Sequence, residues 1–395
     1  MSVSEVVEEY VEAGGTRYPI CGHVDDRFSA VLRAFRTNFA SGSEVGAAVS
    51  LVHDGRTVVD LWGGYQDRAR TKPWAADTIV NMMSVGKVAS AVSIFWLVER
   101  GILDPAAPVA TYWPEFAAAG KSGLTLQWVL DHRAGLAVLE PALPRGAIYD
   151  HGAVSSALAA QAPLWEPGTE AGYHILTQGF LLSEVIRRTD GRSLGRLFAE
   201  EIAAPLELDY WIGLPAQLQP RCAEFVMALE GTILDEAARA PSSWQGRAWA
   251  QLDQDEDFNS PAWRACEIPS ANGHGNARAV GRLMAALAGG GSLDGVRILR
   301  EDTVERMAAE QHNWVEVVMD RAYHQASGVL RNSPPIVWMG PNPRAFGHHG
   351  VGGAIGVADP DAGLGFSYAM NQMHSRIDNG PRAGGLLTAV YEGLA

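Results

Sequence analysis

The sequence predicts an α+β fold, in which an antiparallel sheet is flanked by helices and interrupted by an all-helical domain. Strand patterns occur near the two ends of the 395-residue chain, and helical patterns fill its middle. A chain of this length exceeds one typical core, so about two domains are expected. We expect residues 1–110 and 275–395 to form a discontinuous α/β domain and residues 111–274 to form a mostly helical domain.

The N-terminal part predicts a helix, a hairpin and a second helix. Apolar residues at helical spacing predict the first helix over 27–41. The stretch "GAAVSLVHDGRTVVDLWGG" predicts two strands joined at Asp54-Gly55, a strong hairpin signal. Residues 81–101, "NMMSVGKVASAVSIFWLVERG", are apolar on nearly all sides, so we expect a buried central helix that Gly101 ends.

Helical patterns dominate the middle of the chain, from about 111 to 269. Residues 215–270 are polar and only weakly periodic, and we expect them to form long connections over the surface. A further helix is predicted within 277–291, where three consecutive glycines end it.

The C-terminal part returns to strands. Residues 346–371 predict two strands around the turn Asp359-Pro360-Asp361. A last helix is predicted over about 383–394. Together with the N-terminal hairpin, these strands supply the antiparallel sheet.

Composition and charge exclude several classes of protein. The net charge of −14 disfavours nucleic acid and anionic membrane surfaces as partners. The chain starts with acidic residues where a secretory signal has basic ones, and the apolar run at 85–98 is too short to span a membrane. We therefore expect a cytoplasmic protein. The three cysteines are widely spaced and predict neither a disulfide framework nor a metal site; they are Cys21, Cys222 and Cys266.

The apolar helix at 81–101 carries an unusual lysine. Only three of the 31 basic Lys and Arg residues are lysines, so Lys87 is a candidate for a task that arginine cannot perform, the loss of its proton. Ser84 precedes it by three residues, on the same helix face and near the helix start. A buried, neutral Lys87 could take the serine proton and activate a nucleophile. The alternative is that Ser84 caps the helix and Lys87 extends to solvent.

Two other stretches accompany this pair, whereas the G-x-S-x-G motif of α/β-hydrolases does not occur at any serine. Tyr173 precedes a strongly apolar helical pattern. "FGHHGVGGAIG" holds four glycines within seven residues, in or beside a strand, where glycine permits close approach of a ligand or another backbone.

These motifs resemble those of the serine β-lactamase and penicillin-binding-protein superfamily, and most closely those of the class C-like family VIII carboxylesterases. "SVGK" (84–87) resembles S-x-x-K, and "YHI" (173–175) resembles Tyr-x-Asn or its variants. "HHG" (348–350) resembles Lys-Thr-Gly and the histidine variants of the esterases, and "LDHRAGL" (130–136) resembles a further family stretch. The resemblance extends from about residue 25 to the C-terminus and implies a β-lactamase/DD-peptidase-like fold.

The resemblance also implies roles for individual residues. Ser84 would be the acylated nucleophile, and Lys87 and Tyr173 would share the general-base work through coupled protons. The backbone N–H groups of Ser84 and Val351 would form the oxyanion hole, with Val351 on the strand after "HHG". Gly352 and Gly353 would leave room for the acyl group.

Departures from the β-lactamase pattern favour ester hydrolysis. Ile175 stands where the family asparagine contacts the amide side chain of β-lactams. His348-His349-Gly350 replaces Lys-Thr-Gly, so the fixed charge that helps to hold a substrate carboxylate is absent. The acyl-transfer residues are intact. We therefore expect a serine carboxylesterase that acts on small esters.

Other readings stay open on the same fold. They are a β-lactamase, a D-amino-acid peptidase or amidase, an acyltransferase, and a non-catalytic binding relative. No cofactor is expected, and His348 and His349 are poor joint metal ligands because neighbours on a strand point to opposite faces. His132 is expected to pack inside the helical domain. Three tryptophans are candidates for the pocket wall, Trp113, Trp128 and Trp165. The sequence does not indicate an oligomeric state.

Overall fold

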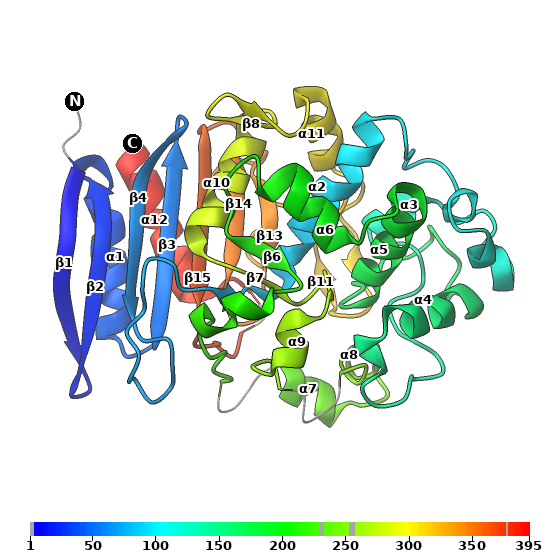
Figure 1. The fold of residues 1–395 in the computed structure, drawn as a ribbon, viewed down its shortest axis with the longest axis horizontal. Helices are drawn as coiled ribbons and strands as arrows, with labels where there is room; N and C mark the ends of the chain where they lie inside the picture. Colours follow the sequence, from blue (N-terminus) through cyan, green and yellow to red (C-terminus); the bar gives the residue numbers. More distant parts are fainter. Residues whose placement is uncertain (1–3, 229–232, 253–256, 377) are drawn as a thin grey trace.

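The structure is a computed structural model that describes residues 4–228, 233–252, 257–376 and 378–395. Its main feature is an eight-stranded antiparallel sheet in the order β1-β2-β4-β3-β15-β14-β13-β12 (Figure 1). The strands are β1 (Ser4–Ala13), β2 (Thr16–Asp25), β3 (Gly46–His53), β4 (Arg56–Gly64), β12 (Leu330–Arg331), β13 (Phe346–His349), β14 (Ile355–Asp359) and β15 (Leu364–Met370). N-terminal and C-terminal strands meet where β3 pairs with β15. The α+β class expected from the sequence is therefore confirmed.

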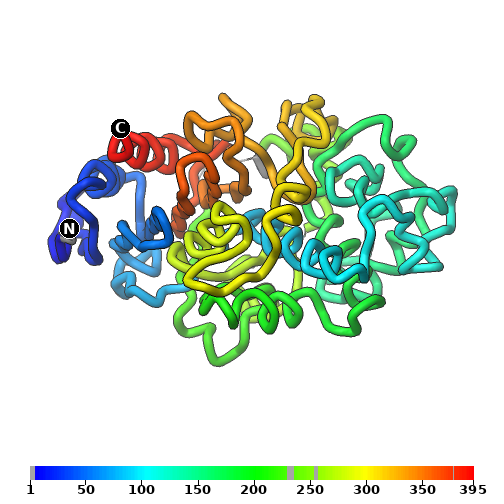
Figure 2. Tube along the Cα trace, turned by 90° about the horizontal axis from the view of Figure 1, so that it is seen from above, coloured from blue at the N-terminus to red at the C-terminus, as the bar shows by residue number. Residues whose placement is uncertain are grey.

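Helices cover both faces of this sheet. α1 (Ser29–Ala40) and α12 (Gly380–Leu394) lie on one face, and α10 (Ala277–Ala288) lies on the other (Figure 2). Gly365 on β15 shows how closely α10 packs, since a Cβ there would lie 2.1 Å from the backbone nitrogen of Ala285. A larger residue at this position would separate helix from sheet.

The remaining elements are mostly helical, and α2 to α9 lie on the side of the C-terminal strands, away from β1 (Figure 1). The α-helices are α2 (Gly86–Glu99), α3 (Leu126–Leu130), α4 (His151–Ala160), α5 (Thr177–Asp190), α6 (Leu194–Phe198), α7 (Ile233–Arg239), α8 (Trp244–Trp249), α9 (Pro261–Ala265) and α11 (Glu301–Ala308). The 3₁₀ helices are η1 (Asp26–Phe28), η2 (Met83–Val85), η3 (Val109–Thr111), η4 (Pro114–Gly120), η5 (Ala147–Tyr149) and η7 (Ala216–Arg221), and η6 (Ala199–Ala203) is a π-helix. Short strands pair as β5 (Val80–Asn81), β7 (Gly273–Gly275) and β6 (Tyr210–Ile212), as β8 (Ser292–Leu293) with β9 (Val296–Arg297), and as β10 (Val315–Glu316) with β11 (Arg321–Ala322).

Three expectations about elements need correction. The first hairpin, β1–β2, was not expected. Its edge strand β1 is acidic, and Val7 is the one apolar residue of β1 that is buried among the residues whose burial is described. Residues 346–371 form three strands rather than two, since the turn at 350–353 separates β13 from β14. The last helix begins three residues earlier than expected, at Gly380.

Residues 215–270 are not simply surface connections. Their described parts form η7, α7, α8 and α9, while 229–232 and 253–256 lie outside the described residues. Ser243 and Ser260 cap α8 and α9 by accepting backbone hydrogen bonds, and Phe225 and Trp263 are buried. These helices are too short for a periodic apolar pattern to reveal them.

α2 is buried along almost its whole length, as its apolar composition predicts. It packs against α5 and α6 in the helical part and against α11 and β13 on the other side. No helix of the described ranges is long and apolar enough to cross a membrane. The division into domains at 1–110, 111–274 and 275–395 stays a prediction.

Candidate active site

Ser84 lies in η2, a single 3₁₀ turn that leads directly into α2. The turn is entered through Met83, whose φ of 49° lies in the left-handed region that residues other than glycine seldom adopt. The side-chain oxygen of Asn81 accepts a hydrogen bond of 2.9 Å from the Met83 N–H and stabilises this conformation. Ser84 therefore stands at a tightly constrained helix start, one turn before Lys87.

Lys87 is buried, with only 1 % of its surface exposed. Its Nζ donates to the carbonyl oxygens of Ile175 at 3.0 Å and Ser270 at 3.1 Å, and it lies 3.4 Å from Ser84 Oγ. No ion pair between described residues involves this ammonium group. Burial holds the pKa of Lys87 well below its ordinary value of 10.5. The environment therefore favours the neutral amine.

The hydrogen bonds fix the orientation of that neutral amine. A neutral amine has two N–H donors and one lone pair, and carbonyl oxygens can only accept. The carbonyls of Ile175 and Ser270 take both donors. The lone pair of Lys87 is then left for the hydroxyl of Ser84. This geometry allows the amine to receive the serine proton.

Tyr173 lines the same small pocket as Ser84. Its ring centroid is 4.7 Å from Lys87 Nζ, and Ser84 lies close enough to act on the pKa of its hydroxyl. Burial raises the pKa of Tyr173 above its ordinary value of 10.0. The phenol is therefore protonated at neutral pH and can donate a proton to a developing alkoxide.

His348 contacts the same phenol. Its Nδ1 lies 2.7 Å from the His349 carbonyl oxygen, which only accepts, so Nδ1 carries the proton. Burial holds the pKa of His348 well below 6.5. The neutral ring thus presents Nε2 as an acceptor, 3.5 Å from the Tyr173 hydroxyl. His348-His349-Gly350, which stands where the family has Lys-Thr-Gly, therefore places no cation beside Tyr173.

Two further histidines hold the backbone around Tyr173. His132 accepts a hydrogen bond from the His174 N–H through Nδ1 at 3.1 Å, and its ring lies 4.8 Å from that of Tyr173. His174 donates through Nδ1 to the Gly172 carbonyl and accepts from the Leu136 N–H through Nε2. Burial lowers the pKa of both histidines, that of His174 to about 4. His132 thus packs inside the helical region as expected, directly beside the site.

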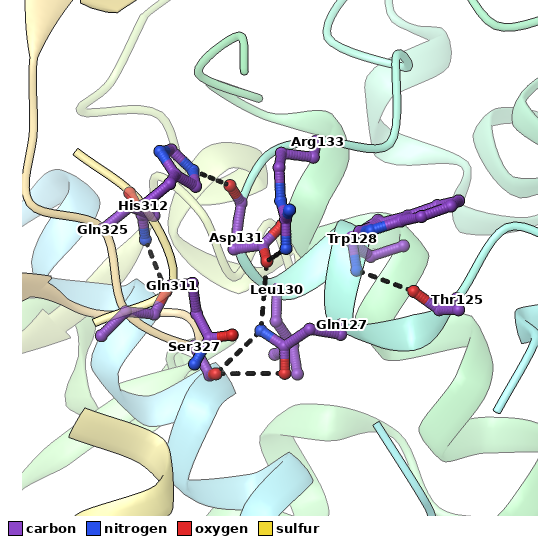
Figure 3. Close-up of polar contacts among 12 residues, drawn as sticks. Thr125, Gln127, Trp128, Leu130, Asp131, Arg133, Gln311, His312, Gln325 and Ser327 are labelled. Carbon is purple, nitrogen blue, oxygen red and sulfur yellow. Dashed lines mark hydrogen bonds and ion pairs between the residues drawn. The ribbon is translucent and has the colours of Figure 1, made fainter. Parts of the chain in front are cut away.

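The "LDHRAGL" stretch is held by a buried polar network (Figure 3). The Asp131 carboxylate accepts hydrogen bonds from Gln127 and Arg133, and its backbone carbonyl lies 2.9 Å from His312 Nε2. Ser327 bonds to the Gln127 side chain and ties this network to the segment before β12. The network fixes His132, which has a left-handed φ of 64°, and through it the Tyr173 segment.

The glycine-rich turn at 350–353 faces Ser84. Val351 lies in this turn after β13 and not on the strand, which corrects the expectation from the sequence. In the described part of the chain, neither the Val351 N–H nor the Ser84 N–H donates to a protein acceptor. A Cβ at Gly350 would lie 2.3 Å from the Met82 carbonyl oxygen, so only glycine lets the turn approach η2 this closely.

The pocket at Ser84 is narrow and has two parts, both bordered by Ile175, Trp249 and Val351. One part, of about 30 Å³, contains Tyr173, Met319, Tyr323, Leu330 and His349. The other, of about 20 Å³, is strongly apolar and contains Leu176, Phe225, Leu252, Phe258 and Trp263 among others. Gly352 and Gly353 border neither part, because their missing side chains would face Met373 and His374.

The tryptophans expected in the wall are not those found there. Trp113 packs on Phe116, and Trp165 packs on Trp244. Trp249 and Trp263 line the pocket instead, and the indole N–H of each is buried without a hydrogen-bond partner. They come from α8 and α9, the elements that the sequence pattern did not reveal.

Glu316 on β10 is a second residue that sequence reasoning missed. Its carboxylate accepts hydrogen bonds from the backbone N–H groups of Tyr173 at 2.7 Å, Val318 at 3.0 Å and Met319 at 2.7 Å. Burial raises its pKa to about 7. Glu316 therefore joins the Tyr173 segment to the β10–β11 hairpin that carries the pocket residue Met319. A single glutamate between Val315 and Val317 gives no signal of this role.

The described residues contain no group of three or more His, Cys, Asp or Glu that could hold a metal ion. The site thus consists of a serine, an amine, a phenol, two free backbone N–H groups and apolar walls.

Comparison with known proteins agrees with this geometry. The Beta-lactamase family model matches residues 28–388. The esterase/beta-lactamase LipL of Mycobacterium tuberculosis is 35% identical over 379 residues, which cover 90% of this chain and 84% of that protein. The crystal structure of a family VIII carboxylesterase matches with a TM-score of 0.88 and 40% identity, covering 95% of this chain and 99% of the other. A penicillin-binding-protein homologue from Caulobacter crescentus matches with a TM-score of 0.87 and 37% identity, covering 95% and 99%. The resemblance read from the motifs is confirmed, and the chain belongs to the Beta-lactamase family.

Proposed function

We propose that this protein is a serine carboxylesterase that cleaves small carboxylic esters through an acyl-enzyme on Ser84. The observation that carries the proposal is the position of Lys87 Nζ, which is buried, bound to two backbone carbonyls and 3.4 Å from the Ser84 hydroxyl oxygen. The names of the relatives, an esterase/beta-lactamase and a family VIII carboxylesterase, support the same reaction class.

The acylation step follows from the positions of the groups. Ser84 Oγ attacks the ester carbonyl carbon while its proton passes to Lys87 Nζ. The carbonyl oxygen becomes an oxyanion and accepts hydrogen bonds from the backbone N–H groups of Ser84 and Val351, each worth about 3 kcal/mol at best. The bond to the alcohol oxygen then breaks, Tyr173 protonates that oxygen, and Lys87 passes the proton it took from Ser84 to the phenolate, which leaves both groups as they began. Water enters by the reverse sequence and releases the acid.

The pocket favours esters over β-lactams. Its walls near Ser84 are apolar, with Ile175 where an amide contact would be needed. The neutral His348 offers no charge to a substrate carboxylate. A β-lactamase, a D-amino-acid peptidase or amidase and an acyltransferase are the rival activities on this fold, and a non-catalytic binding protein is the rival of another class. A cytoplasmic location stays part of the proposal.

The test is a substrate panel with matched variants. The wild-type enzyme is expected to hydrolyse p-nitrophenyl acetate and butyrate far faster than nitrocefin. Ser84→Ala is expected to abolish ester turnover. Ser93→Ala serves as the control, because Ser93 is buried on the same helix and its hydroxyl donates to the Ala89 carbonyl at 2.8 Å. Comparable nitrocefin turnover would replace the proposal with a β-lactamase, and no turnover of any ester would refute it.

A further inference from the structure

The turn after β13 contains two glycines to which the reaction described above gives no role. Gly352 and Gly353 border neither part of the catalytic pocket, yet their φ values of 95° and 122° are positive and favour glycine. Two backbone hydrogen bonds close the turn, from the Gly350 N–H to the Ala354 carbonyl at 2.7 Å and from the Gly353 N–H to the Gly350 carbonyl at 3.1 Å. The glycine conformations therefore set the orientation of the peptide groups in this turn.

One of these bonds fixes the peptide group that carries the Val351 N–H. In a planar trans peptide group, the N–H points opposite to the carbonyl oxygen of the preceding residue. The Gly350 carbonyl belongs to the same group as the Val351 N–H, and it accepts from the Gly353 N–H inside the turn. The Val351 N–H, which has no acceptor among the described residues, is thereby held pointing out of the turn.

Arg382 on α12 holds the next peptide group in the same way. The Gly352 carbonyl belongs to the group that supplies the Gly353 N–H, and it accepts from Arg382 Nη2 and from the His374 N–H, both at 3.1 Å. Two hydrogen bonds in series therefore connect the guanidinium, through two peptide groups, to the Val351 N–H. Hydrogen bonds in such a chain polarise one another, so each bond strengthens the next.

The guanidinium itself is held firmly. Arg382 is only 4 % exposed, and its Nη1 donates to the Ser43 carbonyl and the Glu44 carboxylate, at 2.8 Å each. Its Nη2 donates to the Gln372 carbonyl at 2.7 Å as well as to Gly352. The four N–H groups of the two terminal nitrogens are then all used in a rigid fork. A lysine has one donor nitrogen and cannot reproduce this geometry.

We propose that Arg382 is a positioning residue for the oxyanion hole. Through the peptide groups 352–353 and 350–351, it orients the Val351 N–H toward the oxygen of the reacting ester. The inference rests on the proposed esterase function, in which this N–H stabilises the developing oxyanion. Arg382 acts through the backbone and contacts no substrate. Because Glu44 neutralises the guanidinium, arginine contributes mainly a fixed direction and not a charge.

The experiment compares a ligand that forms an oxyanion with one that does not. When 1,1,1-trifluorobutan-2-one adds to Ser84, its carbonyl carbon bonds to Oγ, the serine proton passes to Lys87, and the carbonyl oxygen becomes an oxyanion. p-Nitrophenetole resembles p-nitrophenyl acetate but has no carbonyl group. Arg382→Lys is expected to lower kcat/KM for p-nitrophenyl acetate and the affinity for the ketone by the same factor, about 10- to 100-fold. Its Ki for p-nitrophenetole is expected to stay within about twofold of the wild type.

Two further variants separate positioning from stability. Gly353→Ala places a Cβ 2.8 Å from His374 Cδ2 at a positive φ, so it displaces the middle of the chain of hydrogen bonds and should give the same losses as Arg382→Lys. Tyr368→Phe is the matched control, because it removes a hydrogen bond to Glu44 and leaves the bond from Arg382 to the turn. It is expected to lower Tm but to keep kcat/KM and ketone affinity within about twofold.

The outcomes separate the two proposals. If Arg382→Lys and Gly353→Ala keep the wild-type ketone affinity, or weaken ketone and p-nitrophenetole binding equally, the positioning role is overturned and the esterase proposal stands. The same loss of ketone affinity in Tyr368→Phe also overturns the role, because the effect would then follow from stability. A wild-type enzyme that is inert toward p-nitrophenyl acetate overturns both proposals. Should Arg382→Lys fail to fold, Gly353→Ala decides by the same criteria.

Discussion

At the scale of single residues, the central feature is an amine kept neutral by burial. Lys121 gives the contrast within the same chain. It is equally buried and donates to the carbonyls of Ala118, Ala159 and Gln161, yet its hydrogen-bond partners include no serine. Both lysines satisfy their donors with backbone carbonyls, but only Lys87 has a hydroxyl to deprotonate. The position of Lys87 therefore requires a group that can accept a proton, and not a fixed positive charge.

Replacing Lys87 by arginine is expected to be as damaging as replacing it by alanine. Guanidinium stays protonated, so Lys87→Arg and Lys87→Ala should each lower kcat/KM for p-nitrophenyl acetate about 10²–10⁴-fold. Lys121→Arg is the matched control for placing arginine at a buried, carbonyl-bound lysine. If Lys87→Arg kept most of the activity, the role assigned to Lys87 would be wrong.

The pH dependence of the reaction follows from the lowered pKa of Lys87. The active form is the neutral amine, which is lost as the pH falls through this lowered pKa. Ester kcat/KM is therefore expected to decline on the acid side and to be level already well below pH 10.5, the ordinary pKa of lysine. A rate that rises steadily up to pH 10 would show an unperturbed lysine.

At the scale of elements, the site depends on connections that hold three segments together. η2 supplies Ser84, the turn at 350–353 supplies Val351, and the β10–β11 hairpin positions Tyr173 through Glu316. Each connection is made by backbone hydrogen bonds or by a close glycine contact. Small changes in these connections should therefore alter catalysis without altering the fold.

Glu316 gives the hairpin a pH-dependent stability. Its folded pKa of about 7 lies above the ordinary 4.5, so its contribution is fully present below pH 4.5 and is lost as the pH rises through about 7. The Tm of the wild type minus that of Glu316→Gln, whose side chain stays neutral, is expected to fall between pH 5 and pH 8. Differential scanning calorimetry at the two pH values measures it, and a wild type that gains Tm relative to Glu316→Gln over this range would contradict the assignment.

The elements also show where reading the sequence succeeds. The hairpin at 46–64 and the helix of Lys87 follow from local patterns, a Gly turn signal and a continuous apolar face. The edge hairpin β1–β2 and the short helices α7 to α9 do not. These elements have no clear local pattern of apolar residues, and contacts with the rest of the fold determine them. Trp249 and Trp263 belong to α8 and α9, which is why the tryptophans of the pocket wall were predicted wrongly, and Glu316 belongs to the two-residue strand β10.

At the scale of the whole molecule, a buried ion pair joins the N-terminal and C-terminal parts of the chain next to the active site. Arg382 on α12 pairs with Glu44, just before β3, at 2.8 Å, and Glu44 also accepts from Tyr368. The same guanidinium donates to the Gly352 carbonyl at 3.1 Å, in the turn that carries Val351. The discontinuous sheet therefore brings together motifs that lie far apart in the sequence. The order of the motifs along the chain predicts that they meet, but it does not predict which residues contact one another.

Breaking this pair is expected to destabilise the protein strongly. Arg382→Ala leaves Glu44 buried and unpaired, which should lower the free energy of unfolding by about 3–5 kcal/mol. Arg376→Ala, which removes an exposed pair with Asp378, should change it little. Urea denaturation compares the two variants. An equal loss in the free energy of unfolding in both would show that burial does not make the Arg382–Glu44 pair more important for stability than an exposed pair.

The most direct test of the account is labelling with a fluorophosphonate probe, followed by mass spectrometry of the proteolytic peptides. The account predicts a single labelled peptide, modified at Ser84, with no label in Ser84→Ala and much slower labelling in Lys87→Arg. A wild-type protein that stays unlabelled, or that is labelled at another residue, would contradict it.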